Sequence, residues 1–119
     1  MVVGGGWSHR LGLYDAFLLK DTHRTIFRSD FEAIFEKIEK ASHLGRFVEI
    51  EVESLAEAIK CAQVFKNRHF KVPFLLMLDN MKPSKIRETI VAVRKIDSTI
   101  IFEASGGINE KNVAVYAKT

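Results

Sequence analysis

The sequence predicts an α/β fold in which parallel βα units form part of a barrel. Short apolar segments alternate along the chain with longer segments whose apolar residues recur at helical spacing. Such alternation predicts right-handed crossovers and a parallel sheet covered by helices. One strand sequence is also acidic along one side, which favours a barrel over a flat sheet covered on both faces. At 119 residues, 47% of them hydrophobic and 28% charged, the chain is long enough for one domain.

The first half of the chain contains two pairs of a strand and a helix. Residues 16–19 and 47–52 are apolar segments of strand length, and residues 1–4 are a further candidate strand. A serine followed three residues later by a glutamate marks the start of each helix, at Ser29 and at Ser54. This spacing is that of a capping box, in which the two side chains bond free backbone N–H groups. We therefore expect these serines to be the N-caps of two helices.

The second half of the chain repeats the alternation. Residues 74–78 and 99–102 are the next apolar segments of strand length. Pro83 is expected to open the helix between them, because proline is tolerated in the first helical turn. A last helix is expected to begin near Asn109.

Polar side chains or glycines lie at the carboxyl end of each of the four main strands. In chain order these residues are Lys20 and Asp21, then Glu51 and Glu53, then Asp79 and Asn80, and finally Ser105, Gly106 and Gly107. The carboxyl ends of parallel strands meet at one edge of the sheet, where the βα loops bind ligands. One such group would be an ordinary solvated turn, but four in the same place predict a functional site.

The strand sequence FVEIEVES separates apolar from acidic residues. Its period of two puts valine and isoleucine on one face and Glu49, Glu51 and Glu53 on the other. A wet barrel mouth can hold these carboxylates, whereas helices on both faces would bury them at a high cost. An internal ion-pair network is the alternative, and we assign it to Glu49 and Glu53 more readily than to Glu51.

Two glycine-containing segments suggest anion binding. In EASGGI the glycines after Ser105 allow the backbone N–H groups to approach a phosphate. In GGGWSHR the guanidinium of Arg10, next to His9, can hold a carboxylate through two hydrogen bonds. Each segment is a weak signal alone, since paired glycines also form plain turns.

Composition excludes several classes of protein. The net charge of +3 is scattered along the chain, which favours small anionic ligands and argues against nucleic acid. No apolar run is long enough to span a bilayer, so we expect no membrane association and a cytoplasmic location. Cys61 is the only cysteine, which excludes an internal disulfide.

Four ordered motifs make the chain resemble the quinolinate phosphoribosyltransferase family, also called carboxylating nicotinate-nucleotide pyrophosphorylases. They are GGGWSHRLGLYDAFLLKDTH, VEIEVESLAEA, LMLDNMKP and FEASGGINEKNV. The resemblance implies an incomplete, TIM-like α/β barrel. It also implies an enzyme of NAD biosynthesis that uses Mg²⁺ to convert quinolinate and phosphoribosyl pyrophosphate into nicotinate mononucleotide, carbon dioxide and pyrophosphate.

The resemblance also implies roles for the cationic residues of the first motif. His9 and Arg10 look like the residues that hold a carboxylate of quinolinate. Lys20 looks like a central cation shared by quinolinate and the phosphoribosyl donor. Thr22 stands where the family usually has asparagine, so an amide hydrogen bond at that position is in doubt.

The remaining implied site residues come from the three later motifs. Glu51 and Asp79 look like the acidic residues around the ribose hydroxyls and Mg²⁺, and with Lys20 they are the expected catalytic residues. Ser105 and Gly106 look like part of the phosphate cradle. Both substrates are polyanions, so cations to hold them and carboxylates to hold the metal fit the implied chemistry.

The resemblance further predicts a single partial barrel domain over residues 1–119. The family's N-terminal domain and barrel-closing strands are expected to be absent, the isolated chain to be poorly active, and the complete enzyme to be a homo-oligomer. Two alternatives remain open: a non-catalytic half-barrel that associates with another chain, and a phosphoribosyltransferase for a different aromatic acid.

Overall fold

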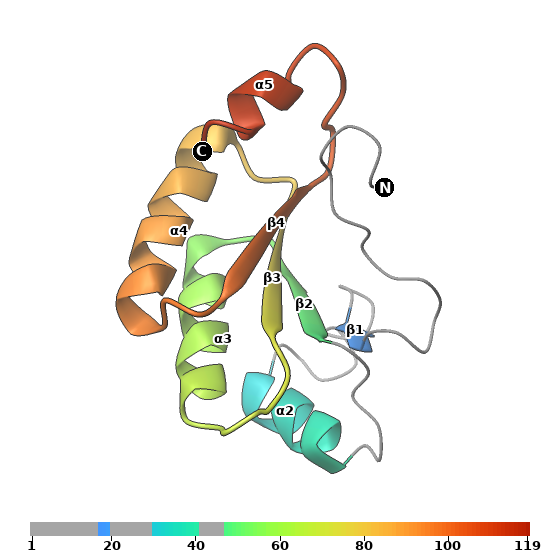
Figure 1. Ribbon diagram of the computed structural model, residues 1–119, viewed down its shortest axis with the longest axis vertical. Coiled ribbons are helices and arrows are strands. Elements are labelled where there is room, and N and C mark those ends of the chain that lie inside the picture. Colours follow the sequence, from blue (N-terminus) through green and yellow to red (C-terminus); the bar gives the residue numbers. More distant parts are fainter. Residues whose placement is uncertain (1–16, 20–29, 41–46) are drawn as a thin grey trace.

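The computed structural model describes residues 17–19, 30–40 and 47–119, and the side chains of 19, 30–40 and 47–119. Four strands and four helices lie in these ranges (Figure 1). In chain order they are β1 (Phe17–Leu19), α2 (Phe31–Lys40), β2 (Val48–Val52), α3 (Leu55–Lys66), β3 (Phe74–Asp79), α4 (Pro83–Ile96), β4 (Ile101–Ser105) and α5 (Val113–Tyr116).

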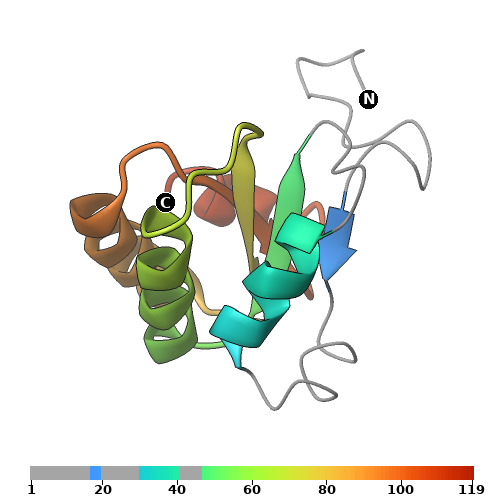
Figure 2. The same cartoon turned by 90° about the horizontal axis from the view of Figure 1, so that it is seen from below.

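The four strands form one parallel sheet in the order β1-β2-β3-β4. Because the order in space equals the order in sequence, each right-handed crossover turns the same way and puts its helix on the same face. Figure 2 shows α2, α3 and α4 in an arc along one side of the strands. This is the arrangement of a barrel wall, and it confirms the predicted fold class. A doubly wound sheet would reverse its strand order and carry helices on both faces.

The core lies between the sheet and these helices. On β2 and β3 the residues that face the helices are almost fully buried, and they are Val48, Ile50, Val52, Phe74, Leu76 and Leu78. A group of phenylalanine rings closes one end of this layer. Phe74 stacks on Phe65 with ring centroids 4.4 Å apart, and Phe35 of α2 lies 5.6 Å from Phe74. Together these contacts fix α2 and α3 against the strands.

Arg68, just beyond α3, joins that region to α2 at the surface. Its guanidinium donates to Glu32 at 2.9 Å and also bonds Glu39. The hydrogen bond that Arg68 donates to Glu32 raises the pKa of Arg68, so its positive charge persists at any ordinary pH. The contact adds charge pairing to an interface that is otherwise made by aromatic packing.

Helix starts follow the sequence closely, with one shift. Ser54 caps α3 by accepting from the backbone N–H of Glu57 at 3.2 Å, as predicted. Pro83 opens α4, also as predicted. Ser29 lies outside the described residues, and the side chain of Asp30 accepts from the backbone N–H of Ala33 at the start of α2.

Two elements near the carboxyl terminus differ from expectation. The last strand begins at Ile101, not at residue 99, because the side chain of Asp97 accepts from both the backbone N–H and the hydroxyl of Thr99 and holds it in a turn. The last helix, α5, has four residues and begins at Val113. Residues 110–112 form turns, which the side chain of Asn109 supports by accepting from the N–H of Lys111.

The candidate strand at residues 1–4 lies outside the described residues. Within the ranges that the structure describes, no helix combines the length and the apolar character that a membrane crossing requires.

Candidate active site

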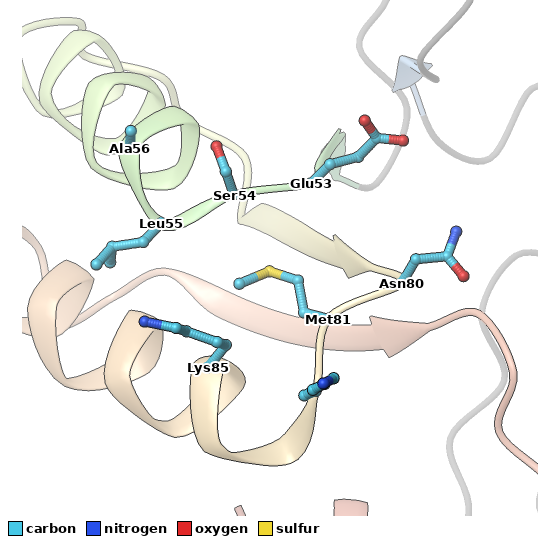
Figure 3. A pocket seen from close by; sticks show the side chains of 8 residues that line it. Glu53, Ser54, Leu55, Ala56, Asn80, Met81 and Lys85 are labelled. Atoms are coloured by element: carbon cyan, nitrogen blue, oxygen red, sulfur yellow. The ribbon is translucent and has the colours of Figure 1, made fainter.

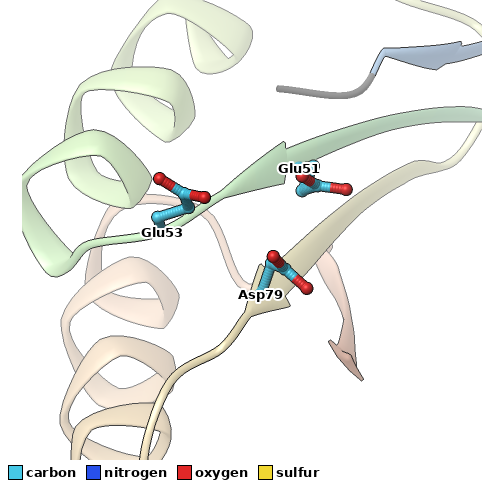
Figure 4. A group of neighbouring side chains, drawn as sticks. All are labelled: Glu51, Glu53 and Asp79. Carbon is cyan, nitrogen blue, oxygen red and sulfur yellow. The ribbon is translucent and has the colours of Figure 1, made fainter. Parts of the chain in front are cut away.

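Three carboxylates meet at the carboxyl ends of β2 and β3. One oxygen each from Glu51, Glu53 and Asp79 can be chosen so that all three lie within 4.8 Å of one another (Figure 4). Glu51 is on β2 and 9% exposed, Asp79 is the last residue of β3, and Glu53 is the first residue after β2. These residues converge because Val52 pairs with Leu78 in the sheet. Glu53 and Asp79, which follow Val52 and Leu78 in the chain, therefore lie next to each other.

This cluster has the donor set of a site for a hard divalent cation. Its ligands would all be carboxylate oxygens, which suit Mg²⁺ or Ca²⁺ and do not suit Zn²⁺ or copper in their usual protein sites. Three like charges so close together also repel one another, and a divalent cation between them would offset that repulsion. The acidic cluster can therefore bind a metal ion.

Asn80, the next residue after β3, contacts the acidic cluster and the neighbouring strand. Its side-chain Nδ2 donates to Asp79 Oδ2 at 2.8 Å. Its backbone N–H donates to the carbonyl oxygen of Ser105 at 2.9 Å, so pairing with β4 continues one step beyond β3. Because Asp79 also pairs with Ser105 in the sheet, the carboxylate cluster and the end of β4 are adjacent.

Two glycines with positive φ follow β4. Gly106 has a φ of 88° and Gly107 a φ of 67°, a conformation that glycine adopts without strain. Asn112 donates from its side chain to the carbonyl oxygen of Gly107 at 2.9 Å, which fixes the orientation of that peptide. A turn of this kind presents backbone N–H groups that can bind an anion, as the sequence EASGGI suggested.

A pocket of about 510 Å³ adjoins the acidic cluster and lies between the starts of α3 and α4. Eight residues line it: Glu53, Ser54, Leu55, Ala56, Asn80, Met81, Lys82 and Lys85. Figure 3 shows Glu53 and Asn80 at one end of the pocket and Leu55 and Lys85 at the other. Lys85 is paired with Glu88 at 2.7 Å. The pocket thus joins the acidic cluster to a more apolar groove with lysines beside it.

Four of the seven predicted site residues lie in the described part of the chain. Glu51, Asp79, Ser105 and Gly106 all lie at the carboxyl edge of the sheet. The other three, His9, Arg10 and Lys20, lie outside the described residues. The roles assigned to all seven by resemblance remain predictions.

Sequence reasoning assigned Glu53 to an ion-pair network more readily than Glu51, and the structure places its carboxylate beside those of Glu51 and Asp79. The signal was present, because the period of two that puts Glu51 on the acidic face also puts Glu53 there. Asn80 was predicted only as one of the polar residues at the strand ends, and Asn112 was not singled out; their contacts with Asp79 and Gly107 could not be read from spacing alone.

Comparison with protein families and known proteins agrees with this geometry. The family model described as "Quinolinate phosphoribosyl transferase, C-terminal domain" matches residues 1–119. A probable nicotinate-nucleotide pyrophosphorylase [carboxylating] from Methanothermobacter thermautotrophicus is 34% identical over 119 residues, which are 98% of this chain and 40% of the relative. The nicotinate-nucleotide pyrophosphorylase [carboxylating] of Mycobacterium leprae is 36% identical over 98% of this chain and 38% of its own length.

Solved structures give the same result. A NadC deletion mutant superposes with a TM-score of 0.75 and 34% identity, over 96% of this chain and 36% of that one. NadC from Streptococcus pyogenes superposes with a TM-score of 0.71 and 34% identity, over 97% and 36% of the two chains. The chain therefore spans about two fifths of the length of these relatives.

Proposed function

The chain belongs to the quinolinate phosphoribosyltransferase family, and from this premise we propose that it supplies the barrel part of a carboxylating nicotinate-nucleotide pyrophosphorylase. The proposed reaction transfers phosphoribose from phosphoribosyl pyrophosphate to quinolinate and releases carbon dioxide and pyrophosphate. One observation carries the proposal within the chain. Asp79 pairs with Ser105, so the acidic cluster and the glycine turn are neighbours at one edge of the sheet.

The first step joins two anionic substrates at a carbon that becomes positively charged. The pyridine nitrogen of quinolinate bonds to the anomeric carbon of the ribose, and the bond from that carbon to the pyrophosphate oxygen breaks. The transition state has oxocarbenium character. Carboxylates near the ribose, here Glu51 and Asp79, favour it because they stabilise positive charge in a partly water-excluded site. Pyrophosphate leaves with the electron pair of the broken bond.

The second step removes one carboxylate from the pyridinium product. The bond between the carboxylate and the ring carbon next to the nitrogen breaks, and carbon dioxide leaves. The electron pair of the broken bond stays on the ring carbon. The positive ring nitrogen stabilises that pair until a proton is taken up at the carbon. Neither step forms a covalent enzyme intermediate in the proposed reaction.

A divalent cation, Mg²⁺ in this proposal, fits the donor set of the acidic cluster and when bound would neutralise charge on the pyrophosphate. Glu51, Glu53 and Asp79 would hold it. The backbone N–H groups of the glycine turn at Gly106 and Gly107 would hold a phosphate.

On the basis of family resemblance, the basic side chains of the first motif would complete the proposed site. Arg10 and His9 would hold a carboxylate of quinolinate, and Lys20 would lie between the two substrates. We further propose that residues 1–119 are one partial barrel domain, and that the complete enzyme is a homo-oligomer. Sedimentation of the complete protein tests that assembly.

The test of function is product analysis with defined substrates. The complete protein that contains this chain is incubated with phosphoribosyl pyrophosphate, Mg²⁺ and quinolinate labelled in the carboxyl group next to the nitrogen. Labelled carbon dioxide and nicotinate mononucleotide should appear together in equal amounts, and both should be lost when Mg²⁺ is chelated. Nicotinate in place of quinolinate is the control for another aromatic acid. Turnover of nicotinate alone, or of neither acid, would contradict the proposed function.

A further inference from the structure

Asn80 follows the last residue of β3 in an unusual backbone conformation. Its φ is 53°, and in the part of the chain that the structure describes it is the one residue other than glycine with a positive φ. Asparagine tolerates this conformation better than most residues, because its short polar side chain can bond locally. The turn is therefore built with a residue that also carries a carboxamide.

That carboxamide is held between the two halves of the candidate site. Its Nδ2 donates to Asp79 Oδ2 at 2.8 Å. On its other side lies Gly106, where an added Cβ would stand only 2.4 Å from Asn80 Oδ1 and 2.9 Å from the Asn80 backbone nitrogen. A real Cβ cannot come so close. Asn80 and the glycine turn can therefore hold these positions together only while residue 106 is glycine.

The amide bond constrains Asp79 in a useful way. The Asp79 side chain is only partly buried and stands at the end of a strand, so its carboxylate has room to rotate. A donor fixed on one oxygen reduces that freedom and leaves the other oxygen as an acceptor. Groups that hold a metal ligand from behind in this way commonly raise metal affinity 10- to 100-fold.

We infer that Asn80 is a positioning residue that orients the Asp79 carboxylate toward a divalent cation and couples this orientation to the glycine turn at Gly106. The inference rests on the proposed function for the use of the cation. It goes beyond that function by linking the cation half of the site to the phosphate half through one side chain.

A role in the turn alone would make a different prediction. Glycine adopts positive φ freely, so Asn80→Gly keeps the turn and removes only the carboxamide. If Asn80 served the backbone alone, this variant would bind cations normally. If it positions Asp79, cation binding falls although the fold is kept.

The experiment is calorimetric titration of the complete protein with Mg²⁺ alone, without either substrate. Four forms are compared: unsubstituted, Asn80→Gly, Gly106→Ala and the double variant. Asn67→Gly is the matched control, because Asn67 caps the end of α3 opposite to Ser54. Circular dichroism and thermal unfolding are measured on each form.

Asn80→Gly is expected to weaken Mg²⁺ binding about 10- to 100-fold, and Asn67→Gly to leave it unchanged. Gly106→Ala is expected to weaken it as well, because the new methyl group displaces the carboxamide that holds Asp79. In the double variant the carboxamide is already gone, and only the contact with the backbone nitrogen of residue 80 and the positive φ of residue 106 still oppose the alanine. The combined loss should therefore be smaller than the product of the two single losses.

Normal Mg²⁺ affinity in a folded Asn80→Gly variant would overturn the inference, as would absence of Mg²⁺ binding in the unsubstituted protein. A double variant whose loss equals the product of the two single losses would overturn the coupling to Gly106. If Gly106→Ala does not fold, the difference in Mg²⁺ affinity between Asn80→Gly and Asn67→Gly decides whether Asn80 positions Asp79. Protein whose Mg²⁺ affinity depends on Asn80 but which does not convert quinolinate would contradict the proposed function and leave this inference standing.

Discussion

The two faces of strand β2 are both closed to water but carry opposite chemistry. Toward the helices, Ile50 and Val52 are 0% exposed, and on the other face Glu49 is 0% and Glu51 9% exposed. Burial of the apolar side chains stabilises the fold by about 1.5–3 kcal/mol each. Burial of a carboxylate costs free energy even when it has partners. The apolar side chains that face the helices therefore stabilise the fold. The buried carboxylates on the other face are better explained by a role in ligand binding.

On β3 only the end of the strand shows this division, because Leu75 and Met77, which pair with the two glutamates of β2, are apolar. Leu76 and Leu78 face the helices and are fully buried, while Asp79 ends the strand at the acidic cluster and is only partly buried. If this comparison is right, substitutions on the helix-facing side should change unfolding and not cation affinity. Substitutions on the carboxylate side should do the reverse.

The largest effect on stability is expected from Phe74→Ala. Phe74 is 1% exposed and packs against the rings of Phe35 and Phe65. Its truncation should lower the free energy of unfolding by about 3–5 kcal/mol, through lost burial and the cavity left behind. Urea denaturation measures this change. A loss below 1 kcal/mol would break the assignment of this face to the core.

Glu51→Gln should have the largest effect on the other face. The change keeps the shape of the side chain and removes its charge, so turnover should fall by about 100-fold or more, equivalent to about 3 kcal/mol of transition-state stabilisation. The free energy of unfolding should not fall, because the neutral amide is cheaper to bury than a carboxylate. Steady-state kinetics and urea denaturation are measured together. Full activity in a stably folded variant would remove Glu51 from the site.

Glu53→Gln sharpens the comparison within the acidic cluster. The structure puts this carboxylate with Glu51 and Asp79, although Glu53 itself is exposed. We expect weaker Mg²⁺ affinity and a higher Mg²⁺ requirement for turnover, with a smaller loss at saturating Mg²⁺ than in Glu51→Gln. A variant with an unchanged Mg²⁺ requirement would remove Glu53 from the cation site.

Ser54→Ala tests a residue that lines the pocket but whose observed contact is structural. Ser54 caps α3 through the N–H of Glu57, so its loss should lower the free energy of unfolding by about 1 kcal/mol. Mg²⁺ affinity should stay the same. A change in Mg²⁺ affinity without a change in stability would mean that the pocket edge at Ser54 belongs to the cation site.

The smallest expected effect concerns the exposed pair of Lys40 and Glu36 on α2. A hydrogen bond from Lys40 lowers the pKa of Glu36 below its ordinary value of 4.5. A lowered folded-state pKa gives a contribution that is present above the ordinary pKa and is lost as the pH falls through the lowered one. Lys40→Gln should therefore lower the melting temperature slightly near neutral pH and not in strong acid. If the two proteins still differ in melting temperature in strong acid, the effect of Lys40 comes from packing and not from its charge.

Much of this architecture can be predicted from local sequence. The alternation of strands and helices, the cap at Ser54 and the start of α4 at Pro83 depend on residues close together in the chain. The acidic face of β2 follows from the period of two. Local rules therefore suffice wherever one segment determines its own conformation.

The rest depends on pairing between segments and on side chains that compete with the backbone. β4 extends to Ser105 because Ser105 pairs with Asp79 of β3, and its start is delayed by the turn that Asp97 makes with Thr99. The contact of Asn80 with Gly106 exists only once β3 and β4 are adjacent. Such features belong to the assembled sheet, so a single segment could not predict them.

The central claim is that the carboxylate side of β2 and β3 holds a divalent cation and that the helix-facing side does not contribute to this binding. Its most direct test is the shift of melting temperature with added Mg²⁺. Mg²⁺ at about 100 times its dissociation constant should stabilise the folded protein by about 2.7 kcal/mol. The full shift should remain in Ile50→Val, which melts lower because of its core defect, and vanish in the triple variant Glu51→Gln, Glu53→Gln and Asp79→Asn. An undiminished shift in the triple variant, or no shift in the unsubstituted protein, would contradict the account.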